Sequence, residues 1–455
     1  MRLRDFAVTF FLVKRHLETA HFMTEQNNIN LPKSWKSELL GKIAKAEKGI
    51  KPKTLIEGKS NNSIPYIDIR AFEKGEIRFY TDGVKCRICE KNDILLVWDG
   101  ARSGLCGKAI KGAIGSTLAK ISSNFLSNEF LFYFLTANYN KLNTTTKGIG
   151  IPHIDPNFLW NLKIFVPPLP EQHRIVAKIE ELFSELDKAV ENLQTARQQL
   201  KTYRQSVLKH AFEGKLTATW RESLKFKNES LKLAAEPASV YQTKNGLPEG
   251  WEWKTVGDIC TKVEYGSSKK SDKEGLVPVL RMGNIQNGLF DWSDLVFSSD
   301  SEEIEKYKLK KGDVLFNRTN SPELVGKTAI YLGEQKAIFA GYLIRIHYKN
   351  DINPKYLTCY LNSLKAKEFG NSVKTDGVNQ SNINGQKLKS YPFPKCTLEE
   401  QHQIVAEIEK RFSEADKLEE SIETALRQTE ALRQSILKKA FAGKLVAQDE
   451  NKAFE

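Results

Sequence analysis

Two long stretches of this chain carry apolar residues at alternating steps of four and three. The first covers residues 167–216 and contains neither Gly nor Pro between residues 171 and 210. This spacing predicts a helix with one apolar seam turned toward a partner helix. The helix is roughly 60 Å long at about 1.5 Å per residue, so it cannot bury its seam against itself. The seam residues are Ile175, Ile179, Leu182, Leu186, Leu193 and Leu200.

The second stretch supplies the predicted partner. Residues 400–445 repeat residues 171–216 without a gap, with about 27 of 46 positions identical, which indicates an internal duplication. The second seam is weaker, because Arg411 and Thr429 stand where the first has Leu182 and Leu200. An alternative is two separate amphipathic helices, each packed on its own domain, but seam and identity coincide over the whole length. The second seam consists of Ile404, Ile408, Leu418, Ile422, Leu432 and Ile436.

A mixed segment precedes each long helix, and the two segments share landmarks. Both open with L-P-x-x-W, at residues 31–35 and 247–251. Residues 63–70 and 277–282 have the composition of strands, and residues 128–136 and 353–361 that of short helices. The sequence therefore predicts an α+β protein with a pseudo-twofold internal repeat: two tandem domains of mixed α and β structure, with two long helices forming an antiparallel coiled coil.

These landmarks also predict the domain limits. Residues 1–22 contain a short apolar run after two arginines, without a cleavage site and too short to span a bilayer, so we expect an extension outside the folded unit. The remaining limits are a first domain at 23–166, a long helix at 167–216, a polar linker at 217–246, a second domain at 247–395, and a second long helix with its tail at 396–455.

The net charge indicates the kind of binding partner, and the cysteine content indicates the cellular compartment. The formal net charge is +13, and a chain this basic usually binds a polyanion, with nucleic acid as the first expectation. The six cysteines include one C-x-x-C pair, Cys86 and Cys89, without a second pair at zinc-site spacing. We therefore expect reduced thiols, no metal and a cytoplasmic protein without a membrane segment.

The layout resembles the specificity (S, or HsdS) subunit of type I restriction-modification systems. The resemblance covers residues 31–445 and is most specific at P-P-L-P-E-Q (residues 167–172), at the paired E-Q-x-x-I-V-A-x-I-E helices and at the L-P-x-x-W openings. It implies two target-recognition domains that each read one half of a split double-stranded DNA sequence, separated by an antiparallel coiled coil.

The same resemblance implies a DNA-binding subunit that performs no chemistry. It would dock two modification subunits, which methylate adenine with S-adenosylmethionine, and in some complexes restriction subunits. The cofactors S-adenosylmethionine, ATP and Mg²⁺ would then belong to the partner subunits and not to this chain.

Two alternatives come from other functional classes. A self-contained DNA-modifying enzyme is disfavoured because the sequence has neither an N-P-P-aromatic loop nor a G-x-G-x-x-G that opens a βαβ unit. V-G-K-T at residues 325–328 lacks the first glycine of a P-loop, since Ser321 occupies that position. A coiled-coil adaptor without DNA specificity fits poorly with the charge and with two divergent domains.

Residues for DNA contact are predicted from side-chain chemistry alone. Phosphates are bound by Lys and Arg, and base edges by Arg, Lys, Asn and Gln. Each domain ends in a polar, glycine-containing closing segment, residues 147–155 in the first and 376–383 in the second, and the first lacks the Gln-Ser-Asn found at residues 380–382. The candidates are Arg70, Arg102, Lys108, Lys147 and His153 in the first domain, and Arg281, Asn284, Asn317, Arg318, Lys327, Asn379, Gln380 and Asn382 in the second.

Overall fold

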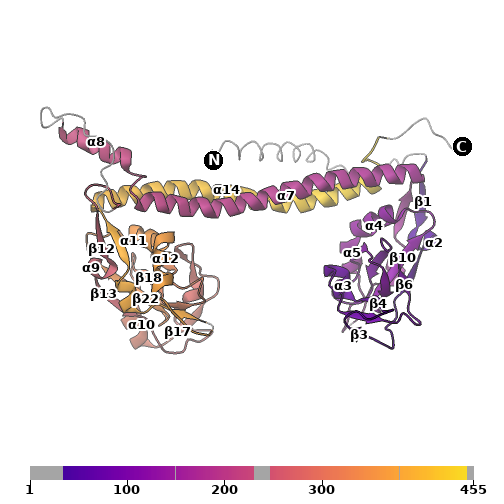
Figure 1. The fold of residues 1–455 in the computed structure, drawn as a ribbon, viewed down its shortest axis with the longest axis horizontal. Coiled ribbons are helices and arrows are strands. Elements are labelled where there is room, and N and C mark those ends of the chain that lie inside the picture. Colours follow the sequence, from indigo (N-terminus) through magenta and orange to yellow (C-terminus); the bar gives the residue numbers. More distant parts are fainter. Residues whose placement is uncertain (1–33, 149, 230–245, 379, 448–455) are drawn as a thin grey trace. The chain divides into compact units, whose positions relative to one another are not determined.

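A computed structural model describes residues 34–148, 150–229, 246–378 and 380–447 (Figure 1). The chain divides into two compact units, Met1–Gln194 with Glu423–Glu455, and Thr195–Ile422. Each unit contains one mixed domain, called a body below, together with half of each long helix. The predicted extension at residues 1–22 lies outside the described residues, and the predicted domain limits stay predictions. No helix in the described part of the chain is long and apolar enough to cross a membrane.

The first body is built on a four-stranded sheet and a five-stranded sheet. Their strand orders are β2-β10-β7-β8 and β3-β5-β4-β9-β6, and a separate pair, β1-β11, joins the two ends of the body. The elements are β1 (Lys36–Leu39), α2 (Leu40–Ile43), β2 (Ala44–Lys48), β3 (Ile56–Glu57), β4 (Ile64–Ile67), α3 (Ile69–Lys74), β5 (Phe79–Thr81), β6 (Ile88–Cys89), β7 (Ile94–Val97), β8 (Cys106–Lys108), β9 (Gly112–Ile114), β10 (Leu118–Ser123), α4 (Asn128–Ala137), α5 (Tyr139–Thr144), α6 (Pro156–Trp160) and β11 (Lys163–Val166).

The second body repeats this plan with different additions. Its four-stranded sheet has the order β13-β22-β18-β20, and β12-β25 joins its ends. The elements are β12 (Glu252–Thr255), α9 (Val256–Ile259), β13 (Cys260–Tyr265), β14 (Val277–Leu280), η1 (Met282–Asn284), β15 (Ile285–Gln286), β16 (Leu289–Phe290), β17 (Val296–Ser298), α10 (Ser301–Tyr307), β18 (Val314–Asn317), β19 (Thr319–Asn320), β20 (Thr328–Ile330), β21 (Ile338–Phe339), β22 (Leu343–Tyr348), α11 (Pro354–Leu361), α12 (Leu364–Val373), β23 (Thr375–Asp376), β24 (Ser381–Asn382), α13 (Gly385–Lys389) and β25 (Pro392–Lys395).

The predicted short helices are confirmed, but the predicted strands end early. α4 and α11 cover the expected positions, whereas the strand expected at residues 63–70 stops at Ile67. Asp68 then accepts a hydrogen bond from the backbone N–H of Ala71 at 2.7 Å and starts α3, which contains Arg70. The first turn of a helix has backbone N–H groups without a backbone partner, and an aspartate cap accepts from one of them. Asp68 therefore favours a helix after Ile67, and the strand ends there.

The two long helices, α7 (Leu169–Phe212) and α14 (Leu398–Phe441), pack against each other in opposite directions. In the first unit Arg433 of α14 pairs with Asp187 of α7, and in the second Arg204 of α7 pairs with Asp416 of α14 at 2.7 Å. The two pairs are equivalent under the repeat, since 433 − 204 and 416 − 187 are both 229. The antiparallel arrangement predicted from the seams is confirmed.

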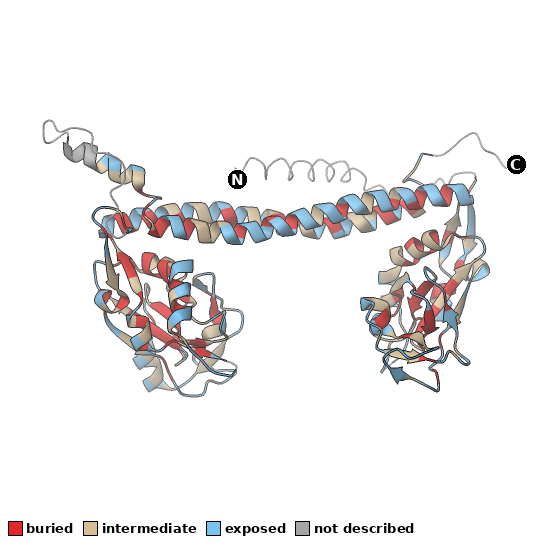
Figure 2. Cartoon of the chain, viewed as in Figure 1, coloured by how far each residue is buried: buried red, intermediate tan, exposed pale blue. Residues whose placement is uncertain are grey.

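Buried residues follow the inner sides of both helices (Figure 2). Of the predicted seam residues, Leu182, Leu418 and Leu432 are half-buried. Thr429 is buried, and its hydroxyl donates to the backbone carbonyl of Leu426 at 2.7 Å, so a polar residue is accommodated in the seam. The buried predicted seam residues are Ile175, Ile179, Leu186, Leu193, Leu200, Ile404, Ile408, Ile422 and Ile436.

The E-Q pair at the start of each long helix attaches that helix to its own body. Glu171 accepts a hydrogen bond from the indole N–H of Trp35 at 3.0 Å, and Glu400 accepts the same bond from Trp251 at 2.9 Å. The following glutamines, Gln172 and Gln401, are buried and bond only backbone groups of their own bodies and helix starts. The L-P-x-x-W and E-Q motifs are therefore two halves of one contact.

The predicted linker begins with a helix that the sequence analysis missed. α8 (Ala218–Glu229) follows α7, and residues 230–245 of the linker lie outside the described residues. Arg221 of α8 pairs with Glu400 and stacks over Trp251, with 5.9 Å between its guanidinium and the ring centre. The start of α8 is held by a long-range ion pair and does not need a broad apolar face. Its sequence therefore has only weak apolar periodicity, and this did not predict a helix.

Candidate nucleic-acid interface

In the first body, an open groove of about 700 Å³ lies between α3, the end of β7 and the closing segment. Two predicted residues, Arg102 and His153, line it, and neither belongs to a regular helix or strand. The groove is also lined by Ile69, Glu73, Val97, Asp99, Gly100, Ala101, Thr117 and Ile151.

A tight turn forms one side of this groove. The backbones of Lys147 and His153 exchange two hydrogen bonds of 2.9 Å. Gly148 has φ +106° and approaches so closely that an added Cβ would lie 2.6 Å from the carbonyl oxygen of Ile151. Glycine is therefore required there, and the turn leaves Ile151 70% exposed at the groove.

Charges in and beside the groove are arranged as pairs in which the basic side chain is exposed and the carboxylate is largely buried. Arg102 pairs with Glu73 at 2.9 Å, and Lys147 pairs with Asp155 at 3.0 Å. The hydrogen bond from Lys147 lowers the pKa of the Asp155 carboxyl below its usual range. The Arg102 and Lys147 side chains are themselves exposed, so an arriving phosphate or base edge can reach them.

The second body has a small three-stranded sheet in the corresponding place. β24, in the closing segment, lies between β19 and β23. There the side-chain amide of Asn382 donates to the hydroxyl of Thr319 at 2.7 Å, and Ser381 pairs with Asp376. The first body has the same pattern as isolated bridges, with His153 between Asp99 and Lys147.

Arg318 joins this sheet to two tyrosines. Its guanidinium lies 4.9 Å from the ring centre of Tyr265 and donates to the carbonyl of Gly341 at 3.3 Å. The backbone carbonyl of Arg318 accepts from the N–H of Ile383 at 2.8 Å, which places it beside Asn382. Tyr265 and Tyr342 are 41% and 51% exposed. Exposed rings beside amide and guanidinium donors form a surface that suits base edges and sugars.

The structure thus brings some predicted residues together and leaves others apart. Arg102 and His153 meet in the first body, and Arg318 and Asn382 in the second. Asn379 lies outside the described residues. Elsewhere, Arg70 pairs with Glu76, Lys108 lies over Phe132, Arg281 pairs with Asp294, Lys327 donates to Gln286, and Gln380 is exposed.

Two predicted residues have structural roles in this conformation. Asn284 is 3% exposed, and its side chain bonds the backbones of Arg281, Asp291 and Asp294. Asn317 is fully buried on β18, and its side chain bonds the backbones of Thr319 and Leu324. Neither can contact a base without opening the turn that it holds, so we do not retain them as direct contacts.

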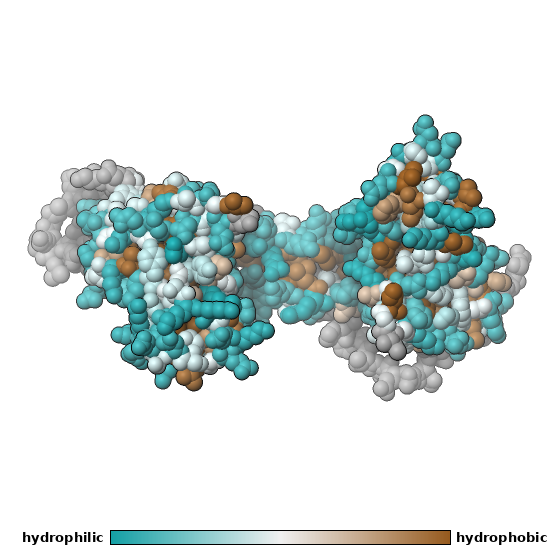
Figure 3. Space-filling model, turned by 90° about the horizontal axis from the view of Figure 1, so that it is seen from below, coloured by the Kyte–Doolittle hydropathy of each residue, from teal (hydrophilic) through white to brown (hydrophobic). Residues whose placement is uncertain are grey.

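Sequence reasoning missed the apolar and acidic parts of both sites. Glu73 and Ile151 of the first groove, and Tyr265 and Tyr342 of the second site, come from segments without a recognisable motif. Figure 3 shows several apolar patches on the surface of the first body, and the exposed residues Ile56, Ile69 and Ile88 belong to this body. Whether a single apolar side chain is exposed depends on which parts of the chain fold over it. The alternation of polar and apolar positions therefore did not predict that these residues are exposed.

The described residues offer little for metal chemistry. They contain no group of three or more His, Cys, Asp or Glu side chains that could hold a metal ion. Cys86 and Cys89 are both free, and the Cys89 thiol is buried against the carbonyls of Ile110 and Gly112 at 3.3 Å. Burial raises the pKa of the Cys89 thiol, which favours its protonated form.

Comparison with known proteins decides the family. The model of the type I restriction modification DNA specificity domain matches this chain twice, at residues 32–198 and 248–428. The chain belongs to this family. Each match covers one body and the larger part of the long helix that follows it, so this specificity-domain family accounts for the repeat as well as for the fold.

Relatives that match this family member are specificity subunits. The Escherichia coli K12 type I restriction enzyme EcoKI specificity subunit is 33% identical over 68% of this chain, and the match spans 63% of that subunit's length. The Methanocaldococcus jannaschii MjaVIII specificity subunit is 26% identical over 92% of this chain and 95% of that protein.

Solved structures support the same architecture. One chain, from a study of complex assembly and conformational transition of the type I R-M system, has a TM-score of 0.66 at 21% identity and covers 91% of this chain and 99% of its own. The HsdS subunit from Thermoanaerobacter tengcongensis has a TM-score of 0.52 at 22% identity and covers 93% and 100%. At these identities the likeness shows the fold alone.

Proposed function

We propose that this chain is the DNA-reading, non-catalytic subunit of a type I restriction-modification complex. Each body would read one half of a bipartite double-stranded sequence. The carrying observation is that both bodies place a partly exposed polar cluster beside the corresponding closing segment of a common scaffold, but with different side chains: Arg102 and His153 in one, Arg318 and Asn382 in the other. A shared scaffold with different chemistry is what two different half-sites require.

The long helices support docking of two copies of one partner. Identity between the repeats in the buried seam has a packing reason, but eleven identical pairs in the two helices are exposed in both copies, and most of them fall on one side of each helix. Two solvent-facing copies of one pattern suit two identical ligands, and the modification subunits are the partners we propose. These pairs include His173 and His402, Ala177 and Ala406, Ser184 and Ser413, Lys188 and Lys417, Glu191 and Glu420, and Gln199 and Gln428.

The chemistry would then belong to the partners. S-adenosylmethionine, and ATP with Mg²⁺ where restriction subunits join, would bind those subunits and not this chain. The purified chain should transfer no methyl group to DNA on its own, and together with its modification subunit it should methylate adenine in both halves of a split site. Methyl transfer by the chain alone would refute this assignment.

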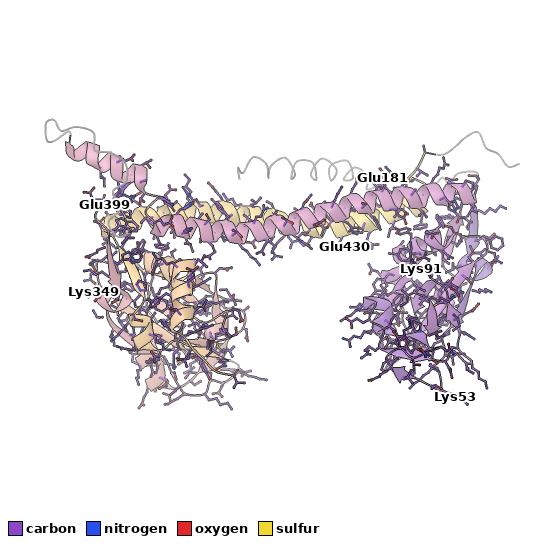
Figure 4. All side chains as sticks on the ribbon, in the orientation of Figure 1. Lys53, Lys91, Glu181, Lys349, Glu399 and Glu430 are labelled. Carbon is purple, nitrogen blue, oxygen red and sulfur yellow. The ribbon has the colours of Figure 1, made fainter. Side chains whose placement is uncertain are left out.

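Half-site variants test the reading itself. Methylome sequencing of a host that carries the complex gives the parental site. Arg102→Ala should then relax or weaken one half, and Asn382→Ala the other, each by about 1–3 kcal/mol for a lost base contact. Lys53→Ala, at an exposed lysine away from the groove and labelled in Figure 4, is the matched charge control and should leave both halves unchanged. Loss of both halves with either variant would contradict one body reading one half.

A further inference from the structure

The seam and its ion pairs do not by themselves select one register for α7 and α14. Asp416, which pairs with Arg204, has glutamates seven residues away on both sides, Glu409 and Glu423. If α14 slid by one heptad, Arg204 would again face a carboxylate and the apolar seam would still face its partner. Exposed pairs of this kind are also weak. Another feature must fix the register.

Each body packs against the end of the long helix that begins in the other repeat. In the second unit Phe212, the last residue of α7, lies edge-on to Tyr356 and Tyr360 of α11, at ring-centre distances of 5.2 and 5.1 Å. In the first unit Phe441, the last residue of α14, lies edge-on to Phe130 and Phe134 of α4, at 5.1 and 5.5 Å. We call these two contacts the aromatic sockets.

The same short helix that forms a socket also holds the start of its own long helix. The side chain of Gln401 accepts a hydrogen bond from the N–H of Asn353, the residue that caps α11, at 2.8 Å. The side chain of Gln172 accepts from the N–H of Ser127, which caps α4, also at 2.8 Å. α4 and α11 therefore each fix the beginning of one long helix beside the end of the other.

The two gripped intervals are equal. From glutamine to phenylalanine, α7 and α14 each span 40 residues (212 − 172 and 441 − 401). Gln172 and Gln401 are at most 1% exposed, Phe212 is 5% exposed and Phe441 is half-buried, whereas the Arg204 side chain is 22% exposed. A slide by one heptad would empty both sockets, which the seam alone would not resist.

From this geometry we infer that the register of the coiled coil, and with it the spacing of the two DNA half-sites, is set by the aromatic sockets and not by the seam. Phe212 and Phe441 are positioning residues for spacing, although they lie in neither recognition cluster. This inference rests on the proposed function, because spacing has a meaning only if both bodies read one DNA molecule.

The test compares socket and seam variants of the full chain in complex with its modification subunit. The socket variant is Phe212→Ala with Phe441→Ala. The matched seam variant is Leu193→Ala with Ile422→Ala, two buried seam residues that are equivalent under the repeat. The readout is methylation of DNA with the parental spacer, relative to spacers changed by about one to three base pairs, a rotation of up to nearly a third of a turn.

The socket variant should lower this discrimination by about tenfold or more, since each edge-to-face pair it loses contributes a factor of several in an equilibrium. The seam variant should keep the parental ratio, even where it lowers the melting temperature. Unchanged discrimination in the socket variant, or an equal loss in the seam variant, would overturn the inference.

Two further measurements separate the other outcomes. If circular dichroism shows that the alanine pair does not fold, Phe212→Leu with Phe441→Leu carries the test and should show the same order, with a smaller loss. If the parental complex methylates both halves at any spacing, the protein does not select a spacing. The inference about the sockets then fails, while the proposed reading of DNA by the two bodies remains. If the parental complex methylates no bipartite DNA, the proposed function itself fails.

Discussion

Lys120 of the first body and Arg345 of the second occupy corresponding strands, β10 and β22, and each pairs with an aspartate just before the neighbouring strand. Lys120 lies 2.9 Å from Asp93, and Arg345 lies 3.0 Å from Asp313. Arg345 in addition donates through Nε and Nη2 to one oxygen of Glu264, Oε2, at 3.0 and 2.6 Å. A guanidinium presents donors along several edges of one plane, so Arg345 binds Glu264 and Asp313 at the same time, whereas Lys120 pairs with Asp93.

The anchors of the long helices show a second difference on the same plan. Trp35 is the side-chain donor to Glu171 among the described contacts, whereas Glu400 binds Trp251, Thr217 and Arg221. The position equivalent to Arg221 in the other repeat is Glu450, a residue outside the described part of the chain. Both repeats therefore keep the hydrogen bond from tryptophan to glutamate, and the ion pair with Arg221 is found at the second glutamate, Glu400.

Both comparisons teach that the two halves kept the contacts that hold body to helix and diverged in what surrounds them. Replacing a whole body should therefore be tolerated if its anchor is kept. The exposed acidic and basic side chains along both helices, including Glu181, Glu399 and Glu430 in Figure 4, lie outside these contacts.

The largest expected effect comes from exchanging one body. Residues 247–395 from another family member, with the tryptophan and the α11 aromatics retained, should replace one half-site completely and leave the other intact, because each body would read its own half. Methylome sequencing of a host with the hybrid measures this. A change in both halves would show that the bodies do not act independently.

A single substitution should separate the two anchors. Glu400→Gln leaves the guanidinium of Arg221, whose side chain is 17% exposed, without its carboxylate, and should lower the free energy of unfolding by about 3 kcal/mol. Glu171→Gln keeps an acceptor for Trp35 and should cost about 1 kcal/mol or less. Urea denaturation of the full chain gives both values.

The control for the anchors is a double-mutant cycle with Arg221→Ala. Added to Glu400→Gln, this change should cost much less than it does in the parental chain. Equal losses from Glu400→Gln and Glu171→Gln would remove the proposed asymmetry between the two anchors.

The smallest effect is expected at acid pH in the Arg345 network. Burial alone would raise the pKa of Glu264, but hydrogen bonds from Arg345 and His347 outweigh it and lower this pKa to about 2, from an ordinary 4.5. A carboxyl with a depressed pKa stabilises the fold above its ordinary pKa, and this stability is lost as the pH falls from about 4.5 toward 2. Glu264→Gln should remove about 1–2 kcal/mol near neutral pH and flatten the acid dependence.

Glu47→Gln is the matched control for the acid dependence. Glu47 lies on β2, the strand that corresponds to β13, and its ion pair with Lys45 is exposed. Its substitution should leave the acid dependence of unfolding unchanged. The free energy of unfolding is measured by fluorescence between pH 2 and 6. If both variants flattened its pH dependence equally, this would argue against the network.

The sequence by itself determined the long helices, their pairing and the duplication. A heptad seam is a local pattern, and a helix with such a seam has few ways to bury it other than against a second seam. The repeat then fixed the order of the parts, and α4 and α11 followed from local composition. α8 was missed, because the contact that fastens its start joins Arg221 to Glu400, 179 residues away.

Only the tertiary structure decided which candidate side chains reach a common surface. Asn317 and Arg318 are adjacent in sequence, yet Asn317 is buried under a turn while Arg318 extends along Tyr265. Polarity at a position says that a side chain can bind a base, but neighbours from distant strands decide whether its donors are already used. The sockets were hidden for the same reason: Phe212 and Phe441 end their helices as ordinary apolar residues, and they acquire a function only where α11 and α4 fold against them.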